Sequence, residues 1–207
     1  MKKLLIVGAG GHGKVVLDCS LEMGCYSQIS FLEHDLNARS VGGHRLYFEQ
    51  EISECFYKSF DEVIVAIGTN DTRLNKTVGY QKMQINLATL VHPRSVVSKS
   101  AKIGKGSVVL ANATINPHAM IGIASIINTG ALIEHDCMLG DGVHISPGSV
   151  LCGGVKIGEK TWVCAGCVVS NNVSIGHRSV IGAGAVVLED IPADSLAYGV
   201  PARVRIT

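Results

Sequence analysis

Aliphatic residues recur at every sixth position, without a gap, through the second half of this 207-residue chain. A period of six fits neither a helix nor a strand that alternates between two faces. It fits a parallel β-helix in which each rung is one short strand and one corner, and three rungs close a triangular turn of about eighteen residues. We expect these side chains to point inward and stack between turns. The sixteen positions are Val97, Ile103, Val109, Ile115, Ile121, Ile127, Ile133, Leu139, Ile145, Leu151, Ile157, Val163, Val169, Ile175, Ile181 and Val187.

Two further columns of residues follow the same period. The position four residues after each aliphatic is small or narrow, from Ser107 to Ala185. We expect it to fit where the corner narrows. Glycine follows the aliphatic directly at several rungs, and we expect it to supply backbone angles that the corner needs. These glycines are Gly104, Gly122, Gly140, Gly158, Gly176 and Gly182.

Composition agrees with such a core and limits the partners. Hydrophobic residues make up 47% of the chain and aromatic residues only 5%, so the core must use small and β-branched side chains. The net charge of +1, with no basic stripe, argues against nucleic acid. No segment is long enough to span a membrane, and the short apolar start runs into Gly8, as a first strand does. Seven scattered cysteines suit a reducing cytoplasm.

The first ninety residues follow a different pattern. Strands are expected at 4–7, 29–32 and 61–67, and helices at 13–23 and 70–83, which predicts a small Rossmann-like parallel α/β domain over residues 1–91. His92 and Pro93 break that pattern, and the β-helix domain is expected over residues 92–207. The tail, residues 193–207, is expected to be extended and docked on the outside of the β-helix.

A glycine turn follows the first expected strand. Gly8, Gly10 and Gly13 match the dinucleotide fingerprint, and Glu33 lies twenty residues after Gly13. Such a turn lets backbone N–H groups approach a pyrophosphate at the positive end of a helix. A dinucleotide site usually needs more sheet than about 90 residues supply. A nucleotide-sugar diphosphate is therefore favoured over NAD, and a purely structural turn remains the third interpretation.

The segment Ile6-Val7-Gly8-Ala9-Gly10-Gly11-His12-Gly13, the segment around Gly68 and the hexapeptide run together resemble the NeuD/PglD sugar O/N-acetyltransferases over the whole chain. The resemblance implies a left-handed β-helix, acetyl-CoA as co-substrate, no metal and a homotrimer. It also implies that the N-terminal domain holds a UDP-amino-sugar through Gly10, Gly11, His12 and Gly68. Where the family usually has Asp, this chain has Glu33-His34-Asp35, so Glu33 and His34 become the candidates for the uridine end.

The segment from Ile133 to Gly148 resembles the family's active site, in which a histidine followed by an acidic residue is the base. His135 is the expected general base, since imidazole accepts a proton near neutral pH. Asp136 or Glu134 is placed to orient the ring, and the resemblance favours Asp136.

The resemblance also implies the acetyl-CoA contacts. His144 matches the position that meets the thioester region, and the backbone contacts match Gly153, Ala165 and Ala183. Asn128 is a candidate substrate contact. The site is expected to form between neighbouring subunits, since a smooth prism has no deep pocket of its own.

The expected function is acetyl transfer from acetyl-CoA to the amine of a UDP-linked amino-dideoxy sugar, by direct attack in a ternary complex. Three alternatives remain: O-acetylation of the sialic acid type, a zinc enzyme of the γ-carbonic anhydrase type using His118, His135 and His144, and a non-catalytic scaffold. Cys164 and Cys167 form a CxxC pair, but Cys167 falls on the narrow position of its rung, which favours a structural role.

Overall fold

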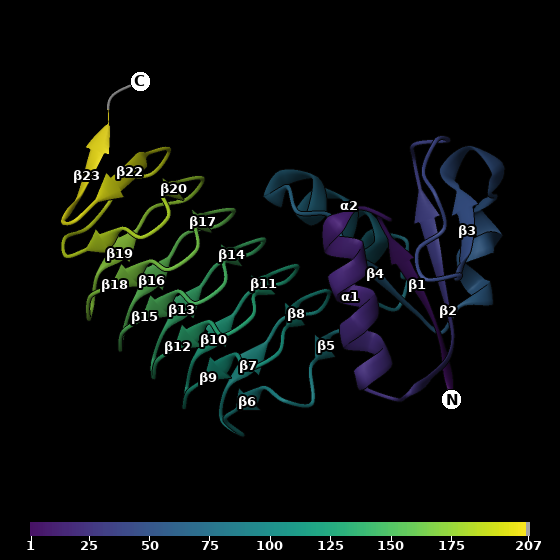
Figure 1. Cartoon of the computed structure of the whole chain (residues 1–207), viewed down its shortest axis with the longest axis horizontal. Coiled ribbons are helices and arrows are strands. Elements are labelled where there is room, and N and C mark those ends of the chain that lie inside the picture. The colour runs from purple at the N-terminus through teal and green to yellow at the C-terminus, as the bar shows by residue number, and fades with distance from the viewer. Residues whose placement is uncertain (206–207) are drawn as a thin grey trace.

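The computed structural model describes residues 1–205 and begins with a four-stranded parallel sheet (Figure 1). The strand order is β3-β2-β1-β4. The strands are β1 (Lys2–Val7), β2 (Tyr26–Glu33), β3 (Arg45–Phe48) and β4 (Glu62–Val65), the helices are α1 (Gly11–Glu22) and α2 (Asn70–Lys82), and two 3₁₀ turns cover Glu49–Glu51 and Glu54–Ser59. The predicted elements are all present, while β3 and the 3₁₀ turns were not predicted.

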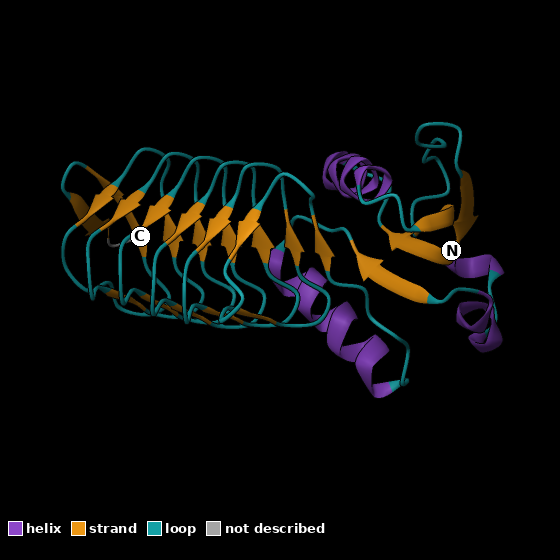
Figure 2. Ribbon diagram, turned by 90° about the horizontal axis from the view of Figure 1, so that it is seen from below, coloured by secondary structure: helices purple, strands orange, loops and turns teal. Residues whose placement is uncertain are grey.

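The rest of the chain forms a three-sided prism of short strands stacked in successive layers, two residues long in β5 to β21 and four in β22 and β23 (Figure 2). The six-stranded face holds β6 (Val96–Val97), β9 (Thr114–Ile115), β12 (Leu132–Ile133), β15 (Val150–Leu151), β18 (Val168–Val169) and β21 (Val186–Val187). The five-stranded face holds β7 (Lys102–Ile103), β10 (Met120–Ile121), β13 (Met138–Leu139), β16 (Lys156–Ile157) and β19 (Ser174–Ile175). The eight-stranded face holds β5 (Leu90–Val91), β8 (Val108–Val109), β11 (Ile126–Ile127), β14 (His144–Ile145), β17 (Trp162–Val163), β20 (Val180–Ile181), β22 (Leu196–Gly199) and β23 (Ala202–Arg205).

The predicted fold class, a small parallel α/β domain followed by a β-helix, is confirmed. Ile121 pairs with Leu139, and Leu139 with Ile157, so each turn takes eighteen residues. From Val109 to Val187 the inward aliphatics are at most 5% exposed. Burying each such side chain contributes about 1.5–3 kcal/mol, which explains why the repeat tolerates no polar interruption there.

The corners differ from expectation in one respect. The glycines that follow the aliphatics do not have positive φ; a Cβ on Gly104 would lie 2.5 Å from the backbone of Gly122 in the next turn. Glycine is therefore required at these positions because consecutive corners stack closely and leave no room for a side chain. The left-handed residue of most corners lies two positions later, as Gly142 (φ 65°) and Asp136 (φ 59°) show. Gly, Asn and Asp adopt this conformation most readily.

The C-terminal tail is extended, as predicted, but it prolongs a sheet. β22 pairs in parallel with β20 as the next strand of the eight-stranded face, and β23 folds back antiparallel to β22. The tail therefore closes the end of the prism and does not cross its outer surface. The final two residues of the predicted segment, 206 and 207, lie outside the described residues.

The α/β domain and the prism share a hydrophobic core. Phe31 and Val16 pack in one cluster with Leu90 and Ile126. β5, which begins at Leu90, already pairs with β8, so the prism sheet starts just before residue 92. The division of the chain into domains at residues 91 and 92 stays a prediction. β1 and β23 lie at opposite ends of the molecule (Figure 1).

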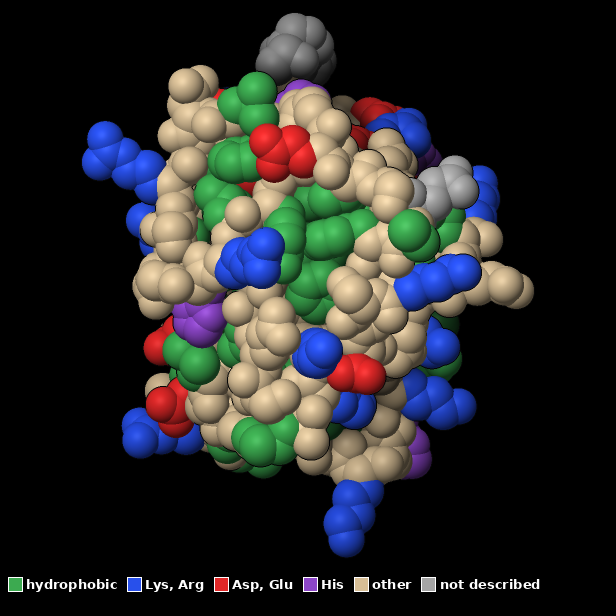
Figure 3. Space-filling view, turned by 90° about the vertical axis from the view of Figure 1, so that its right-hand side faces the viewer, with side chains coloured by type: hydrophobic (Ala, Val, Ile, Leu, Met, Phe, Trp, Pro, Cys, Tyr) green, Lys and Arg blue, Asp and Glu red, His purple; other side chains and the backbone are tan. Residues whose placement is uncertain are grey.

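Figure 3 views the end of the molecule that carries the α/β domain, where apolar side chains gather centrally among scattered Lys and Arg. Within residues 1–205, no helix combines the length and the apolar character needed to cross a membrane.

Candidate active site

The glycine turn joins β1 to α1 and leaves the start of the helix open. Gly8 has a φ of 109°, and a Cβ on Gly13 would lie 2.2 Å from the carbonyl oxygen of Gly8, so both positions require glycine for the fold. Gly10 and Gly11, in contrast, face open space. No side chain caps α1. Its first N–H groups therefore remain available to an anionic group, as a diphosphate requires.

Glu33 holds this turn in place. Its carboxylate accepts hydrogen bonds from the N–H of Ala9 at 2.7 Å and from the N–H of His34 at 2.7 Å. The His34 side chain is largely exposed and lies 3.5 Å from Glu49. Because both oxygens of Glu33 already have donors, this residue acts on the position of the glycine turn. A direct substrate contact by Glu33 or His34 stays a prediction.

Arg73 is buried beneath the turn that follows β4, and no local pattern predicted its role. Arg73 is only 1% exposed. Its side chain joins the α/β domain to the β-helix. The guanidinium donates to the carbonyls of Ile67 and Gly68 at 3.0 and 2.9 Å, and to those of Ala124 and Gly142 at 2.7 and 2.8 Å. Burial lowers the pKa of Arg73 to about 10.

Two histidines lie in the field of Arg73. Burial, with the positive charge of Arg73, lowers the pKa of His12 to about 4. Burial, Arg73 and His12 together lower the pKa of His144 to about 3. Both rings are therefore neutral near pH 7. Within the described residues, Nε2 of His12 is buried and lacks a hydrogen-bond partner. A buried polar atom of this kind is costly unless a ligand completes it.

The hydrogen bonds of His144 determine which ring nitrogen carries its proton. Oδ1 of Asn128 accepts the N–H of Thr129 at 2.8 Å, which turns Nδ2 toward Nε2 of His144 at 3.1 Å. The amide therefore donates to Nε2. We assign the proton of the neutral ring to Nδ1 on this basis, since the neutral imidazole has one donor and one acceptor. His144 can thus act as a hydrogen-bond donor.

His135 lies at another corner, between β12 and β13. Its Nδ1 is 2.8 Å from Oδ2 of Asp136, whose left-handed backbone belongs to that corner. A Cβ on Gly153 would lie 2.6 Å from the imidazole, so the glycine makes room for the ring. The carboxylate fixes the proton on Nδ1 and leaves Nε2 free to accept one. Both side chains are more than half exposed.

The structure brings the predicted residues together as two groups. The glycine turn, Gly68, His12, Asn128 and His144 form the first, beside the eight-stranded face. The second group, His135, Asp136 and Gly153, occupies the corner between the six- and five-stranded faces. Ala165 and Ala183 are exposed on the corner between the eight- and six-stranded faces, which is not the corner that holds the second group. One chain does not unite the two groups.

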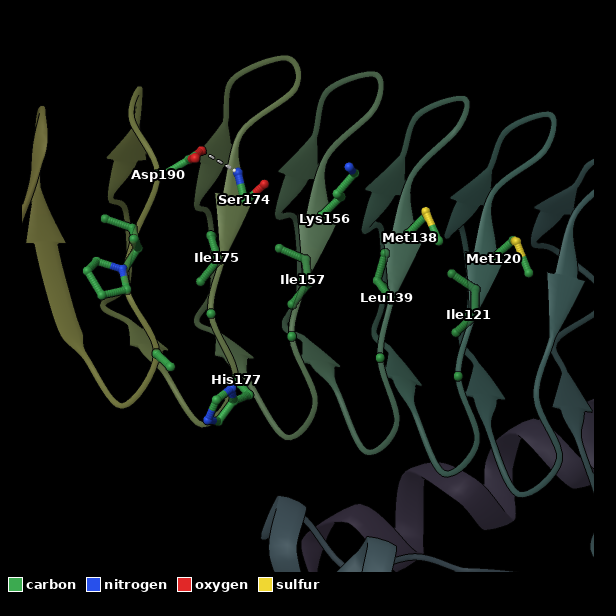
Figure 4. Close-up of a pocket in the computed structure, with 17 residues that line it drawn as sticks. Met120, Ile121, Met138, Leu139, Lys156, Ile157, Ser174, Ile175, His177 and Asp190 are labelled. Carbon is green, nitrogen blue, oxygen red and sulfur yellow. Dashed lines mark hydrogen bonds between the residues drawn. The ribbon is translucent and has the colours of Figure 1, made fainter.

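A surface hollow of about 820 Å³ contains none of the predicted site residues. Figure 4 shows that it runs along β10, β13, β16 and β19, where the side chains of Met120, Met138 and Lys156 project from successive turns of the prism. Met120 and Met138 are 46% and 50% exposed. A smaller cavity of about 440 Å³ lies beside His144 and is bounded by Gly68, Asn70 and Trp162. Asn70 and Trp162, like Arg73, were not predicted as site residues.

Among the side chains that the structure describes, no group of three or more His, Cys, Asp or Glu gathers for a metal ion. Cys164 and Cys167 are free thiols, and burial raises the pKa of both. Cys167 is fully buried at the narrow position of its rung.

Comparison with known proteins supplies the class. Residues 3–77 match the model of the PglD N-terminal domain, and residues 154–189 match the bacterial transferase hexapeptide model of six repeats. The chain therefore combines a PglD-type domain with the β-helix of hexapeptide-repeat transferases.

Solved structures match this chain over its full length, among them the two that follow. Perosamine N-acetyltransferase from Caulobacter crescentus, solved with CoA and GDP-perosamine as a variant with one histidine replaced by asparagine, is 34% identical. The match covers 100% of this chain and 98% of that one, with a TM-score of 0.94. The acetyltransferase domain of PglB from Neisseria gonorrhoeae is 37% identical, with 99% and 100% coverage and a TM-score of 0.92. A second structure of that domain contains acetyl coenzyme A.

A curated relative, UDP-N-acetylbacillosamine N-acetyltransferase of Bacillus subtilis (strain 168), is 37% identical over 116 residues. That match spans 54% of this chain and about half, 52%, of the relative. The chain belongs to the family of acetyl-CoA-dependent, hexapeptide-repeat sugar N-acetyltransferases, and the resemblance found in its sequence is confirmed.

Proposed function

We propose that the protein transfers the acetyl group of acetyl-CoA to the amine of a nucleotide-linked amino-dideoxy sugar, with UDP as the expected nucleotide. The observation that carries the proposal is the presence, in one chain, of two complementary parts. One is a glycine turn with free N–H groups that opens toward a neutral His144. The other is an exposed His135 whose Nδ1 is held by Asp136.

A homotrimer would unite these parts. Because His135 and His144 lie on different sides of one prism, a neighbouring subunit must supply one of them to a complete site. The apolar hollow that includes Met120 and Met138 adjoins the His135 corner, since β13 begins three residues after His135. Exposed apolar surfaces of this kind commonly mark subunit contacts, and closed cyclic symmetry is the usual arrangement of a homo-oligomer.

The reaction then follows from the two histidines. The sugar amine attacks the thioester carbonyl carbon while Nε2 of His135 accepts the amine proton. Asp136 stabilises the resulting imidazolium. Nδ1–H of the neighbouring subunit's counterpart of His144 donates to the developing oxyanion. Collapse of the tetrahedral intermediate breaks the carbon–sulfur bond, and the thiolate leaves with the proton held by His135. The products are the N-acetylated sugar and CoA.

A neutral His144 suits this role. A hydrogen-bond donor that stays uncharged does not require a proton transfer to stabilise the oxyanion, and it costs no reorganisation during the reaction. The nearby positive charge of Arg73 and the open start of α1 favour the diphosphate of the acceptor. The unpartnered Nε2 of His12 gives that acceptor one further hydrogen-bonding group.

The test is release of CoA thiol from acetyl-CoA with a UDP-linked 4-amino-4,6-dideoxy sugar, with GDP-perosamine and with free sialic acid as parallel acceptors. Release with the UDP-amino-sugar supports the proposal as stated. Release with GDP-perosamine alone keeps the N-acetyl transfer and corrects the nucleotide. Release with sialic acid alone replaces the proposal with O-acetylation and leaves the glycine turn a structural feature.

A further inference from the structure

Trp162, the only tryptophan of the chain, projects outward from β17 on the eight-stranded face and is 44% exposed. Its indole is held firmly. Nε1 donates to Oγ of Ser146 at 2.8 Å, and the ring stacks on His144 at a centroid distance of 5.8 Å and an interplanar angle of 6°. A rigid aromatic surface left in solvent forgoes the stabilisation that its burial would give.

The cavity beside Trp162 determines what kind of group fits there. It occupies about 440 Å³, with Trp162, His144 and Val180 on one wall and the turn Gly68–Asp71 on the other. Gly68 belongs also to the proposed diphosphate site, because β4 and β1 are adjacent strands whose carboxyl ends share one edge. A group attached to that diphosphate therefore enters this cavity next.

The charged side chains at the edge of this cavity are already paired and do not favour a further phosphate group inside it. Arg178 is bound through two nitrogens to Asp194, at 2.6 and 2.8 Å, and Lys160 lies 3.1 Å from Asp71. Both cations are neutralised by these carboxylates. The cavity thus offers an apolar wall and no unpaired charge from these two residues, which suits an uncharged ring.

We propose that Trp162 is the surface on which the acceptor's sugar ring packs, and that with Val180 it selects a 6-deoxy sugar. This inference rests on the proposed function and adds to it a residue that determines specificity. The C–H face of a pyranose and a C6 methyl group are apolar and match the indole. A 6-hydroxymethyl group would bury a hydroxyl against the same wall without a partner, which is unfavourable.

The experiment compares Trp162→Ala, Trp162→Phe and wild type in steady-state kinetics. We expect Trp162→Ala to raise the KM for the nucleotide amino sugar about 10- to 100-fold, the range for loss of one stacking platform. The KM for acetyl-CoA should change by less than about threefold, and Trp162→Phe should restore most of the affinity. The preference for a 6-deoxy acceptor over its 6-hydroxymethyl analogue should narrow in Trp162→Ala only. Leu21→Ala, at an exposed apolar position on α1, is the matched control and should match wild type.

Fluorescence gives a readout that does not depend on turnover, because Trp162 is the sole tryptophan. The nucleotide amino sugar should change its emission, while the nucleoside diphosphate alone should leave it unchanged. An unaltered emission with bound nucleotide sugar refutes the inference. A fall in kcat of Trp162→Ala at constant acceptor KM also refutes it, because Trp162 would then act only through His144. A rise in the KM for acetyl-CoA alone in that variant refutes it too. Trp162→Leu, which keeps apolar bulk, replaces Trp162→Ala should that variant fail to fold. Wild-type inactivity with every nucleotide sugar, combined with an emission change, would refute the proposed reaction and leave the binding surface intact.

Discussion

Replacement of Arg73 by methionine tests how the two parts of the molecule are held together. Methionine keeps an unbranched side chain of similar reach but removes every donor. The substitution leaves the carbonyls of Ile67, Gly68, Ala124 and Gly142 without the donor that each now has. Each buried acceptor left without a donor lowers the free energy of unfolding by at least about 1 kcal/mol. Four of them, offset in part by relief from burying a charge, predict a loss of about 3–4 kcal/mol.

For a chain of this size, a loss of about 3–4 kcal/mol lowers the midpoint of thermal unfolding by about 6–16 °C. The assay is thermal unfolding followed by circular dichroism. Lys82→Met, at an exposed position on the same helix, is the control and should change the free energy of unfolding by less than about 0.5 kcal/mol. A single buried carbonyl without a donor would lower the midpoint by about 2 °C or more. If the midpoint of Arg73→Met stays within about 2 °C of wild type, the reasoning is refuted and water satisfies the four carbonyls.

Three further outcomes follow from the site. His135→Ala should lower kcat about 10²- to 10⁴-fold while nucleotide-sugar binding, measured by calorimetry, is retained, and Asp136→Asn should have a smaller effect on kcat. Gly11→Ala should fold normally and raise the acceptor KM, whereas Gly13→Ala should lower thermal stability because its Cβ meets a backbone oxygen. Stability should decline as pH falls from about 6.5 toward 4, because His144 takes up a proton more readily when unfolded than when folded.

Each outcome has a result that would contradict it. More than about a tenth of wild-type activity in His135→Ala would remove that residue from the role of base. Equal stability of the two glycine variants would show that the turn can rearrange. For the pH dependence, the sign is set by the pKa values: the folded value of about 3 lies below the ordinary 6.5, so the stabilisation is complete above pH 6.5 and is lost on acidification. Stability that rises on acidification over that interval would contradict burial of a neutral His144.

The β-helix was predictable because its rule is local. Every rung repeats the same requirement for an inward aliphatic residue, and each turn then brings equivalent positions, such as Ile121, Leu139 and Ile157, into register. The glycine turn was also predictable, since its spacing encodes a strand, a turn and a helix. His135 and Asp136 are neighbours in the chain, so their hydrogen bond needs only the corner that the repeat already supplies.

The tail and β3 show where local patterns fail. β3 is short and only partly buried, so its sequence lacks the alternation of apolar and polar residues that would predict a strand. The tail lacks the hexapeptide pattern, yet Leu196 and Ala197 pair with Val180 and Ile181, because the last rung leaves an unpaired sheet edge. Covering that edge, which would otherwise be open to other chains, favours the hairpin.

The sequence by itself determined the prism and the inward register, and it predicts His135 as the base, because each depends on residues close together along the chain. Only the tertiary structure decided that Arg73 lies beneath the glycine site, that His144 is neutral, and that Trp162 lines a cavity. Burial and charge at these residues arise from segments far apart in the sequence, and their spacing follows no repeat. The separation of His135 from His144 on different sides of the prism likewise comes from the folding of the rungs into three faces.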